Sequence, residues 1–188
     1  LEKLVDTSDE WIKSRVGINQ RHVVSDGEAS SDMSTKVAHS LLEKRGISAA
    51  NIDVIIIGTV TPDHPTPSTA AIVQNNINAE NAWAFDLSAA CSGFLYALET
   101  GAKFIESGQY KTIMVIGVDT MTSILDFEDR ETCIIFGDGA GGVILEASKS
   151  NTGILGSVLK TDGSGAESLN VLAGGSKSPA SLATIKNR

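Results

Sequence analysis

The chain holds 188 residues, and its 23 acidic against 15 basic side chains give a net charge of −8. That charge argues against nucleic acid or an anionic membrane as a partner, and two cysteines in a chain of this length do not make a disulfide framework. No apolar run reaches transmembrane length and no signal peptide is recognisable, so the sequence predicts a cytoplasmic protein of one domain or two small ones, with reduced thiols.

The first predicted element is a short helix within residues 6–18, with Thr7 opening a capping box and Gly17 ending the helix. Trp11 and Arg15 are one helical turn apart and therefore share a face. An indole beside a guanidinium can hold a flat base and a phosphate together. The alternative is a surface helix anchored by one tryptophan, and the residues alone favour that alternative.

Residues 31–46 are predicted to form a second helix, begun by a serine or aspartate cap and ended by a glycine. The uninterrupted apolar run Val54 to Ile57 is typical of a strand buried on both faces, which indicates a parallel sheet. A proline-rich loop over residues 61–68 leads to the next helix. We interpret His39 in the helix and His64 in the loop as solvated rather than catalytic.

A strand, a turn of small residues, one cysteine and a helix follow one another over residues 82–107. This order places Cys91 at the tip of a strand and at the amino end of a helix. The unpaired N–H groups and the dipole of that helix favour a thiolate, and the same groups can hold a developing oxyanion. A buried structural cysteine is the alternative. Position alone leaves both interpretations open.

The run Thr112 to Val118 is predicted to be another strand, and alternating strands and helices imply right-handed crossovers in a parallel α/β layer. Because this run is so apolar, we expect it to be an edge strand that pairs with its mate across a two-fold axis. The polar segment 119–131 is predicted to be a loop, with Arg130 at its end. Ile154 to Leu159 is predicted to form one more strand.

The segment 132–147 contains the dinucleotide spacing G-x-G-x-x-G in its glycines, which are Gly137, Gly139 and Gly142. The dinucleotide motif needs a strand before it and a helix after it. A strand is predicted over 133–136, but the residues that follow, 142–145, are β-branched and favour a second strand. We therefore exclude a bound NAD and interpret the glycines as a close-packed hairpin against the active site.

Three stretches, TSDEWIKSRVGI, DLSAACSGFLYAL and DRETCIIFGDGAGGVIL, occur in the order and spacing of a known family. They resemble the amino-terminal half of β-ketoacyl-acyl carrier protein synthase III over residues 1–165. The resemblance implies a thiolase-like α/β fold, the amino-terminal half of an αβαβα layered domain with a mixed, mostly parallel sheet. Residues 1–165 would be the half-domain with the nucleophile, and 166–188 the start of a linker or insert. It also implies a homodimer formed through a strand beside the nucleophile helix.

The activity that the resemblance implies is acyl transfer. Cys91 would take the acyl group of acetyl-CoA or a similar primer, and a decarboxylating Claisen condensation with malonyl-acyl carrier protein would begin fatty-acid synthesis. The family's histidine and asparagine motifs are absent from this chain, which is expected to be a fragment or half of a longer enzyme. Alternatives are a hydroxymethylglutaryl-CoA synthase-like enzyme, a specialised ketosynthase, or a non-catalytic dimerising fragment.

The resemblance also assigns binding residues. Trp11 and Arg130 would sandwich the adenine of coenzyme A, Arg15 would meet its phosphate or base, and Thr7 would lie in the same site. Phe136 would line the tunnel to the thiol. Where family members commonly carry a bulky apolar residue in the acyl pocket, this chain has Thr66, which leaves the acyl-chain preference open. No metal and no bound cofactor are implied, because acyl-CoA is a substrate.

Overall fold

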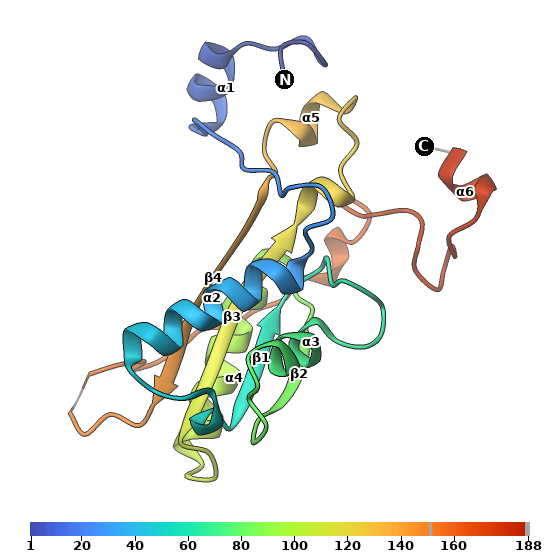
Figure 1. Cartoon of the computed structure of the whole chain (residues 1–188). Helices are drawn as coiled ribbons and strands as arrows, with labels where there is room; N and C mark the ends of the chain where they lie inside the picture. The colour runs from blue at the N-terminus through green and yellow to red at the C-terminus, as the bar shows by residue number, and fades with distance from the viewer. Residues whose placement is uncertain (151, 187–188) are drawn as a thin grey trace. The chain divides into compact units, whose positions relative to one another are not determined.

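The computed structural model describes residues 1–150 and 152–186, which divide into the compact units Leu1–Ser157 and Val158–Arg188. The first unit is built on one sheet in the order β2-β1-β3-β4 (Figure 1). Its strands are β1 (Val54–Gly58), β2 (Trp83–Leu87), β3 (Thr112–Thr120) and β4 (Asp138–Glu146). The strands β2, β1 and β3 are parallel and β4 is antiparallel to β3, which confirms a mixed, mostly parallel sheet.

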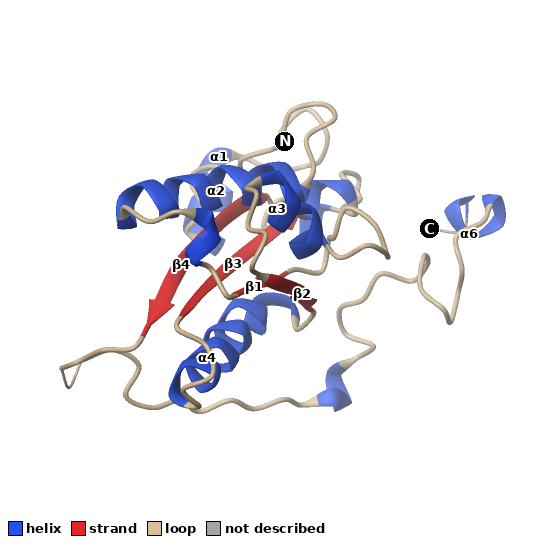
Figure 2. Cartoon of the chain, turned by 60° about the horizontal axis from the view of Figure 1, so that its bottom comes forward, coloured by secondary structure: helices blue, strands red, loops and turns tan. Residues whose placement is uncertain are grey.

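Two layers of helices cover the two faces of the sheet (Figure 2). The helices α2 (Ser30–Arg45) and α3 (Thr69–Asn76) pack on one face, where Ile55 and Ile57 of β1 meet Met114 and Ile116 of β3. The helix α4 (Gly93–Glu106) packs on the other face against the intervening residues of the same strands. Alternate side chains of a strand point to opposite faces, so a strand apolar at every position becomes buried on both. The continuous run in β1 therefore correctly indicated a central parallel strand.

Capping groups fix where the first helices begin and end. The helix α1 (Asp9–Val16) begins at Ser8, whose Oγ accepts the Trp11 N–H at 3.1 Å, so the predicted cap at Thr7 is wrong by one residue. It ends at Gly17, whose φ of 73° suits a left-handed cap. In α2 the predicted serine or aspartate cap is also wrong. The helix follows Ala29, whose N–H donates to the Asp32 carboxylate inside the first turn at 2.8 Å.

The strand β3 lies in the interior of the sheet, between β1 and β4. The prediction that Thr112 to Val118 forms an edge strand and pairs across a two-fold axis is therefore wrong. Its apolar side chains are explained by helices on both faces and strands on both sides, with Ile113 to Ile116 fully buried. The outer strands are β2 and β4, and β2 comes directly before the turn that holds Cys91.

The predicted hairpin over residues 132–147 is also wrong. Asp129 caps a short helix, α5 (Arg130–Cys133), by accepting the Glu131 N–H at 2.9 Å, and the strand expected over 133–136 is replaced by the last residue of this helix and the turn after it. The glycine-rich segment then runs into a single strand, β4, which pairs along its whole length with β3. The expected strand over residues 154–159 is not formed either, since these residues take no regular structure.

The second unit is short of regular structure. It contains a 3₁₀ turn, η4 (Gly163–Gly165), capped by the Asp162 carboxylate, and the helix α6 (Leu182–Lys186). Several of its apolar side chains are exposed, among them Leu169, Leu172 and Leu182. The division predicted at residue 165 stays a prediction.

Candidate active site

Cys91 lies where the sequence placed it, in a 3₁₀ turn, η2 (Ala90–Ser92), between β2 and the first residue of α4. Its side chain is exposed. Ala90, the residue before it, has a φ of 47°, the left-handed conformation that a side chain with a Cβ adopts only at a cost. Strain of this kind is typical of functional turns, where the surrounding packing holds a residue in place to present its neighbour.

Close packing of backbone on backbone fixes the depth of this turn. A Cβ added to Gly58, at the end of β1, would lie 2.8 Å from the carbonyl carbon of Gly93 at the start of α4. A Cβ on Gly117 of β3 would likewise lie 3.2 Å from the side chain of Phe94. These two glycines let the amino end of α4 rest directly on the sheet. The thiol of Cys91 is thus presented at the edge where the parallel strands end.

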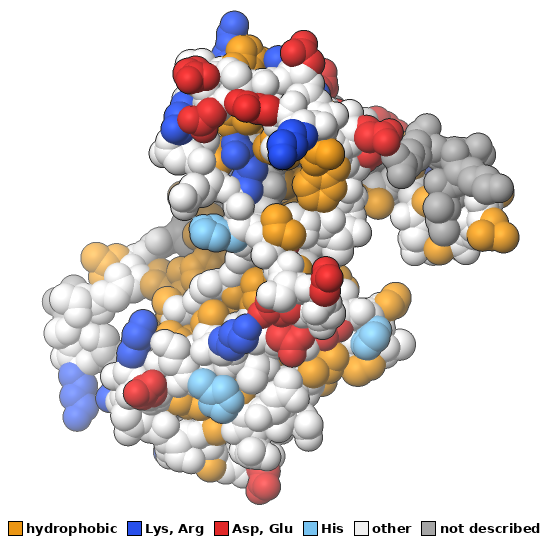
Figure 3. Space-filling view, turned by 45° about the horizontal axis from the view of Figure 1, so that its top comes forward, with side chains coloured by type: hydrophobic (Ala, Val, Ile, Leu, Met, Phe, Trp, Pro, Cys, Tyr) orange, Lys and Arg blue, Asp and Glu red, His pale blue; other side chains and the backbone are white. Residues whose placement is uncertain are grey.

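A second group of predicted residues lies on a small lobe at that same edge, which we call the α1–α5 lobe and define as residues 1–18 and 121–137. It continues from the carboxyl end of β3 and has a core of its own, centred on Ile12, Cys133 and Ile134 (Figure 1). Figure 3 shows acidic and basic side chains mixed over the surface that carries α1 and α5.

Trp11 and Arg130, far apart in the sequence, meet in this lobe. The guanidinium carbon of Arg130 lies 4.2 Å from the centroid of the Trp11 ring, a cation–π contact. Because the two side chains stack on each other, a flat base that enters between them has to part them by the thickness of a ring. The structure therefore brings together the pair that the resemblance assigned to adenine.

Two further predicted residues lie beside this pair. The Oγ1 of Thr7 is buried and has no hydrogen-bond partner within the described part of the chain, so it is open to a polar group of a ligand. Arg15 lies one turn after Trp11 on α1 and is exposed. Both positions suit contacts with a ligand that reaches the Trp11 ring.

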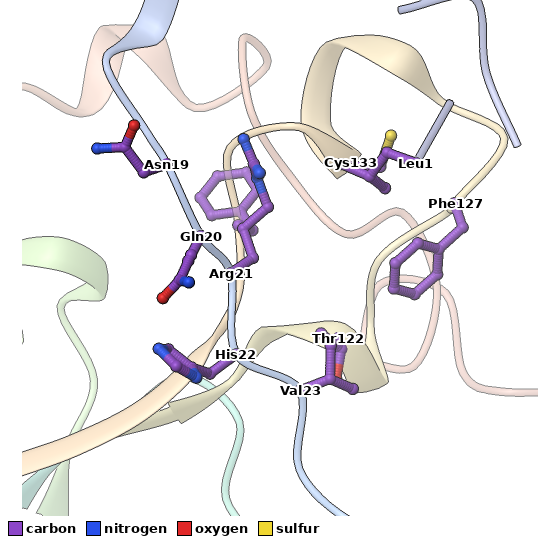
Figure 4. A pocket seen from close by; sticks show the side chains of 10 residues that line it. Leu1, Asn19, Gln20, Arg21, His22, Val23, Thr122, Phe127 and Cys133 are labelled. Atoms are coloured by element: carbon purple, nitrogen blue, oxygen red, sulfur yellow. The ribbon is translucent and has the colours of Figure 1, made fainter. Parts of the chain in front are cut away.

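A cavity of about 570 Å³ opens at the base of the lobe, and Phe136 is one of its lining residues (Figure 4). Figure 4 shows Arg21 reaching into the site from the segment after α1, with Phe127 and Cys133 on the opposite side. The Nε of Arg21 donates to the Ile134 carbonyl at 2.6 Å, and its Nη2 is buried without a hydrogen-bond partner among the described residues. The wall is thus a mixture of apolar and polar side chains.

The second cysteine, Cys133, is buried where Cys91 is exposed. Cys133 is 1% exposed and packs in the core of the lobe. Burial, and secondarily the nearby Asp129 carboxylate, raise the pKa of its thiol above the ordinary value of 9.0. Because the thiolate is the nucleophile, this environment makes Cys133 inert.

The loop between β1 and α3 carries Thr66, which is exposed. A second cavity of about 490 Å³ adjoins this loop, and His64, Phe85 and Asp86 are among its lining residues. The Asp86 carboxylate is already used, since it accepts the N–H groups of Thr69 and Ala70 at the start of α3, at 2.7 and 2.8 Å. Thr66 and Cys91 are not among the residues that line this cavity.

Sequence reasoning missed Asp138 and Arg21. Asp138 is 9% exposed, and its carboxylate accepts three hydrogen bonds from the segments on either side of the lobe. The signal that could have revealed it is a carboxylate in the middle of a glycine-rich, otherwise apolar segment. Arg21 left no comparable signal, because it lies in a segment without periodicity.

The sequence and the fold of this chain are similar to those of known proteins. The family model for 3-oxoacyl-[acyl-carrier-protein (ACP)] synthase III matches residues 85–163. The β-ketoacyl-[acyl-carrier-protein] synthase III of Chlorobaculum tepidum is 58% identical, over 98% of this chain and 57% of that protein. The corresponding protein of Solibacter usitatus is 53% identical, over 100% of this chain and 58% of that protein. The chain belongs to the β-ketoacyl-acyl carrier protein synthase III family.

Solved synthase III structures have the same architecture. The enzyme from Aquifex aeolicus VF5 superposes with a TM-score of 0.77 at 46% identity, over 79% of this chain and 48% of that chain. The Thermus thermophilus enzyme gives a TM-score of 0.83 at 38% identity, over 88% of this chain and 51% of that chain. These likenesses confirm the thiolase-like fold. This synthase III chain spans a little over half the length of the curated relatives it matches, 57% and 58% of the first two.

Within residues 1–150 and 152–186, no helix is long and apolar enough to cross a membrane. The same residues hold no group of three or more histidine, cysteine, aspartate or glutamate side chains arranged to bind a metal ion.

Proposed function

We propose that the protein carrying this chain is an acyltransferase that condenses an acyl-CoA primer with malonyl-acyl carrier protein, the reaction that begins fatty-acid synthesis. The observation that carries the proposal is the presentation of Cys91, an exposed thiol on a strained turn at the amino end of α4. Relatives named β-ketoacyl-[acyl-carrier-protein] synthase III, at 46–58% identity, support it.

In the first step, the Cys91 thiolate attacks the carbonyl carbon of the acyl-CoA thioester. The carbon–sulfur bond to coenzyme A breaks, coenzyme A leaves as a thiolate, and the acyl group stays on the Sγ of Cys91. The amino end of α4 points its N–H groups and the positive end of its dipole toward the turn, where negative charge develops on the carbonyl oxygen.

The coenzyme is held on the α1–α5 lobe. Adenine enters between the Trp11 ring and the Arg130 guanidinium, which exchanges a cation–π contact for stacking on both faces of the base. Arg15 meets a phosphate or the base, and the Thr7 hydroxyl gains the partner that it lacks. The cavity lined by Phe136 leads away from this site, and its mixed lining suits the amides and methylenes of the pantetheine arm.

In the second step, the malonyl group on the carrier protein loses carbon dioxide, and its carbanion attacks the acyl carbon on Cys91. The cysteine leaves as a thiolate and a 3-oxoacyl product remains on the carrier. Donors for the enolate oxygen are expected in the family's histidine and asparagine motifs, which do not occur in residues 1–188. The histidines His22, His39 and His64 match none of these motifs.

Assembly and location belong to the same proposal. The outer strand β2 lies beside the nucleophile turn, which makes it the strand through which a homodimer would form. Thr66 would then contribute to the partner subunit's acyl pocket, with a smaller side chain than is common there. A nucleophilic thiol has to stay reduced, which favours the cytoplasm.

Mass spectrometry of the intact full-length protein tests the proposal directly. After incubation with acetyl-CoA, the protein should gain one acetyl group on a peptide that contains Cys91, and malonyl-acyl carrier protein should then remove it as a 3-oxoacyl product. Cys91→Ser should gain no acetyl group, while Cys133→Ala should behave as the wild type. Acetylation that survives in Cys91→Ser would overturn the proposal.

A specialised ketosynthase is the second candidate. The priming β-ketosynthase of the R1128 polyketide pathway superposes with a TM-score of 0.76 at 34% identity, over 79% of this chain and 44% of that chain. Both candidates use Cys91 in the same way and differ in the primer. Competition between acetyl-CoA and longer or branched acyl-CoA primers, read as the ratio of kcat/KM values, separates them.

A further inference from the structure

The α1–α5 lobe stands on few connections to the sheet. Its own core is small, and the chain enters and leaves it through the segment after α1 and the ends of β3 and β4. The relative placement of Trp11 and Arg130 therefore depends on how the segment after α1 is fastened to the beginning of β4. Hydrogen bonds at the base of the lobe connect these two segments.

Asp138, the first residue of β4, binds this segment twice. Its N–H donates to the His22 carbonyl at 2.8 Å, and its Oδ2 accepts the Val24 N–H at 2.8 Å. The same carboxylate reaches the loop after β3, because Thr122 donates its N–H to Oδ1 at 2.8 Å and its hydroxyl to Oδ2 at 2.6 Å. One buried carboxylate thus joins three segments, and hydrogen bonds to a charged group are the stronger kind.

Gly137 makes the close approach possible. A Cβ at this position would lie 3.1 Å from the His22 carbonyl oxygen and 3.2 Å from the Arg21 Cβ. Gly139, two residues along, has nothing within 4 Å of an added Cβ. Within two residues, the glycine-rich segment therefore has one position with little room for a side chain and one position with room for it. On the other side of the contact, Arg21 fastens the same segment to the end of α5 through its 2.6 Å bond to the Ile134 carbonyl.

We infer that Gly137 and Asp138 form a clasp that sets coenzyme affinity from a distance, as positioning residues that hold α1 against α5 so that Trp11 and Arg130 face each other. The inference rests on the proposed function of the lobe as the coenzyme site. It assigns a role to the G-x-G-x-x-G segment. Its first glycine, Gly137, allows two backbone segments to come close together rather than allowing a pyrophosphate to bind.

The substitution Asp138→Asn tests the clasp selectively. The amide keeps one oxygen for the Thr122 N–H, but its NH₂ faces the Val24 N–H, so the bond to the segment after α1 is lost. Gly137→Ala disturbs the same contact more mildly, because the His22 carbonyl has to give way by a few tenths of an ångström. The matched controls are Asp119→Asn, a carboxylate of β3 that binds residues 59–61 instead, and Gly139→Ala.

The first readout is independent of function. In the full-length protein with Trp83 and any tryptophan outside residues 1–188 replaced by Phe, Trp11 is the single tryptophan, and its quenching by acrylamide reports whether Arg130 covers the ring. We expect the quenching constant to rise about twofold in Asp138→Asn and Gly137→Ala, as an uncovered indole becomes accessible. We expect no change in the two controls. Thermal unfolding of each variant identifies any that has lost its fold. If Asp138→Asn does not fold, the milder variant Gly137→Ala carries the test.

The second readout is the split between KM and kcat for acetyl-CoA in the full-length protein. We expect KM to rise about tenfold in Asp138→Asn, the size expected when one hydrogen bond to a charged group is lost, while kcat changes less than about twofold. Unchanged quenching and KM in the folded clasp variants would overturn the inference. Increased quenching with an unchanged KM would also overturn it. In that case the KM of Trp11→Ala shows whether the coenzyme site itself was assigned wrongly.

Discussion

Gly58 at the end of β1 lies against Gly93 at the start of α4, so closely that a Cβ on Gly58 would come within 2.8 Å of the Gly93 carbonyl carbon. The neighbouring atoms are helix backbone, which cannot rotate out of the way as a flexible side chain can. The contact therefore fixes how far the amino end of α4, and with it Cys91, stands above the sheet.

Gly58→Ala should displace the first turn of α4 and with it the thiol. We expect the free energy of unfolding to fall by about 1–3 kcal/mol, the usual cost of overpacking, and the rate of Cys91 acylation to fall as well. Denaturant unfolding and single-turnover acylation of the full-length protein measure the two effects. Gly141→Ala is the control, since an added Cβ there meets nothing within 4 Å. Equal behaviour of the two variants would show that the Gly58–Gly93 contact does not position the turn.

The two cysteines should differ sharply toward an alkylating reagent. Limiting iodoacetamide at neutral pH should label Cys91, because its side chain is exposed, and leave Cys133 unlabelled, because it is buried and its pKa is raised. Labelling of Cys133 should appear only as the pH rises past its ordinary value of 9.0 or as the protein unfolds. Peptide mapping by mass spectrometry decides, with Cys91→Ser as the control. Preferential labelling of Cys133 in the folded protein would refute the assignment of the nucleophile.

Local sequence signals predicted the position of Cys91 between β2 and α4 well, because strand, turn, cysteine and helix are adjacent in one stretch. The left-handed Ala90 could not be predicted, since alanine disfavours that conformation and only the packing of α4 enforces it. The position of β3 inside the sheet was missed because the order of strands is set by contacts between distant residues. The strand predicted over 133–136 is not formed, because the helix that Asp129 caps ends at Cys133 and a turn follows it. An apolar run this short does not by itself determine which structure it takes.

The pairing of Trp11 with Arg130 was expected only from the family resemblance, and the structure places the two side chains in contact. Trp11→Ala or Arg130→Ala should raise KM for acyl-CoA with little change in kcat, at a cost of about 1–3 kcal/mol if stacking on the base is worth what it is elsewhere. Steady-state kinetics of the full-length protein measure this. Trp83→Phe is the control, a conservative change of the other tryptophan. Wild-type KM in both variants would return Trp11 to the role of an anchor for a surface helix.

The outer strand β2 offers a test of the proposed dimer. Its first residue, Trp83, is 43% exposed and stacks on Phe85 of the same strand at 5.3 Å between ring centroids. A lysine on an edge strand opposes pairing with another chain, so Trp83→Lys should shift the full-length protein from dimer to monomer. Sedimentation velocity measures the shift, and Trp83→Phe keeps the edge apolar as the control. A wild-type protein that sediments as a folded monomer would contradict the dimer.

The cap of α5 should make the lobe sensitive to acid. The Asp129 carboxylate accepts hydrogen bonds from the Thr132 hydroxyl and the Glu131 N–H, and these lower its pKa below the ordinary value of 3.8. A carboxyl with a depressed folded-state pKa stabilises the fold above its unfolded pKa, and that contribution is lost as the pH falls through the lowered value. The α5 cap, and with it the placement of Arg130 on Trp11, should therefore weaken only below about pH 4, the ordinary range for an aspartate.

Asp129→Asn removes this titration. In the full-length protein with Trp11 as its single tryptophan, the fluorescence of the wild type should change in one step as the pH falls, and that step should be missing in Asp129→Asn. At neutral pH the variant should already be less protected against acrylamide, because an uncharged amide accepts the Glu131 N–H and the Thr132 hydroxyl more weakly than the carboxylate does. Glu10→Gln makes the same change of charge on the exposed part of α1 and should leave the wild-type step in place. If the step persisted in Asp129→Asn, another group would have to be responsible for the acid response of the lobe.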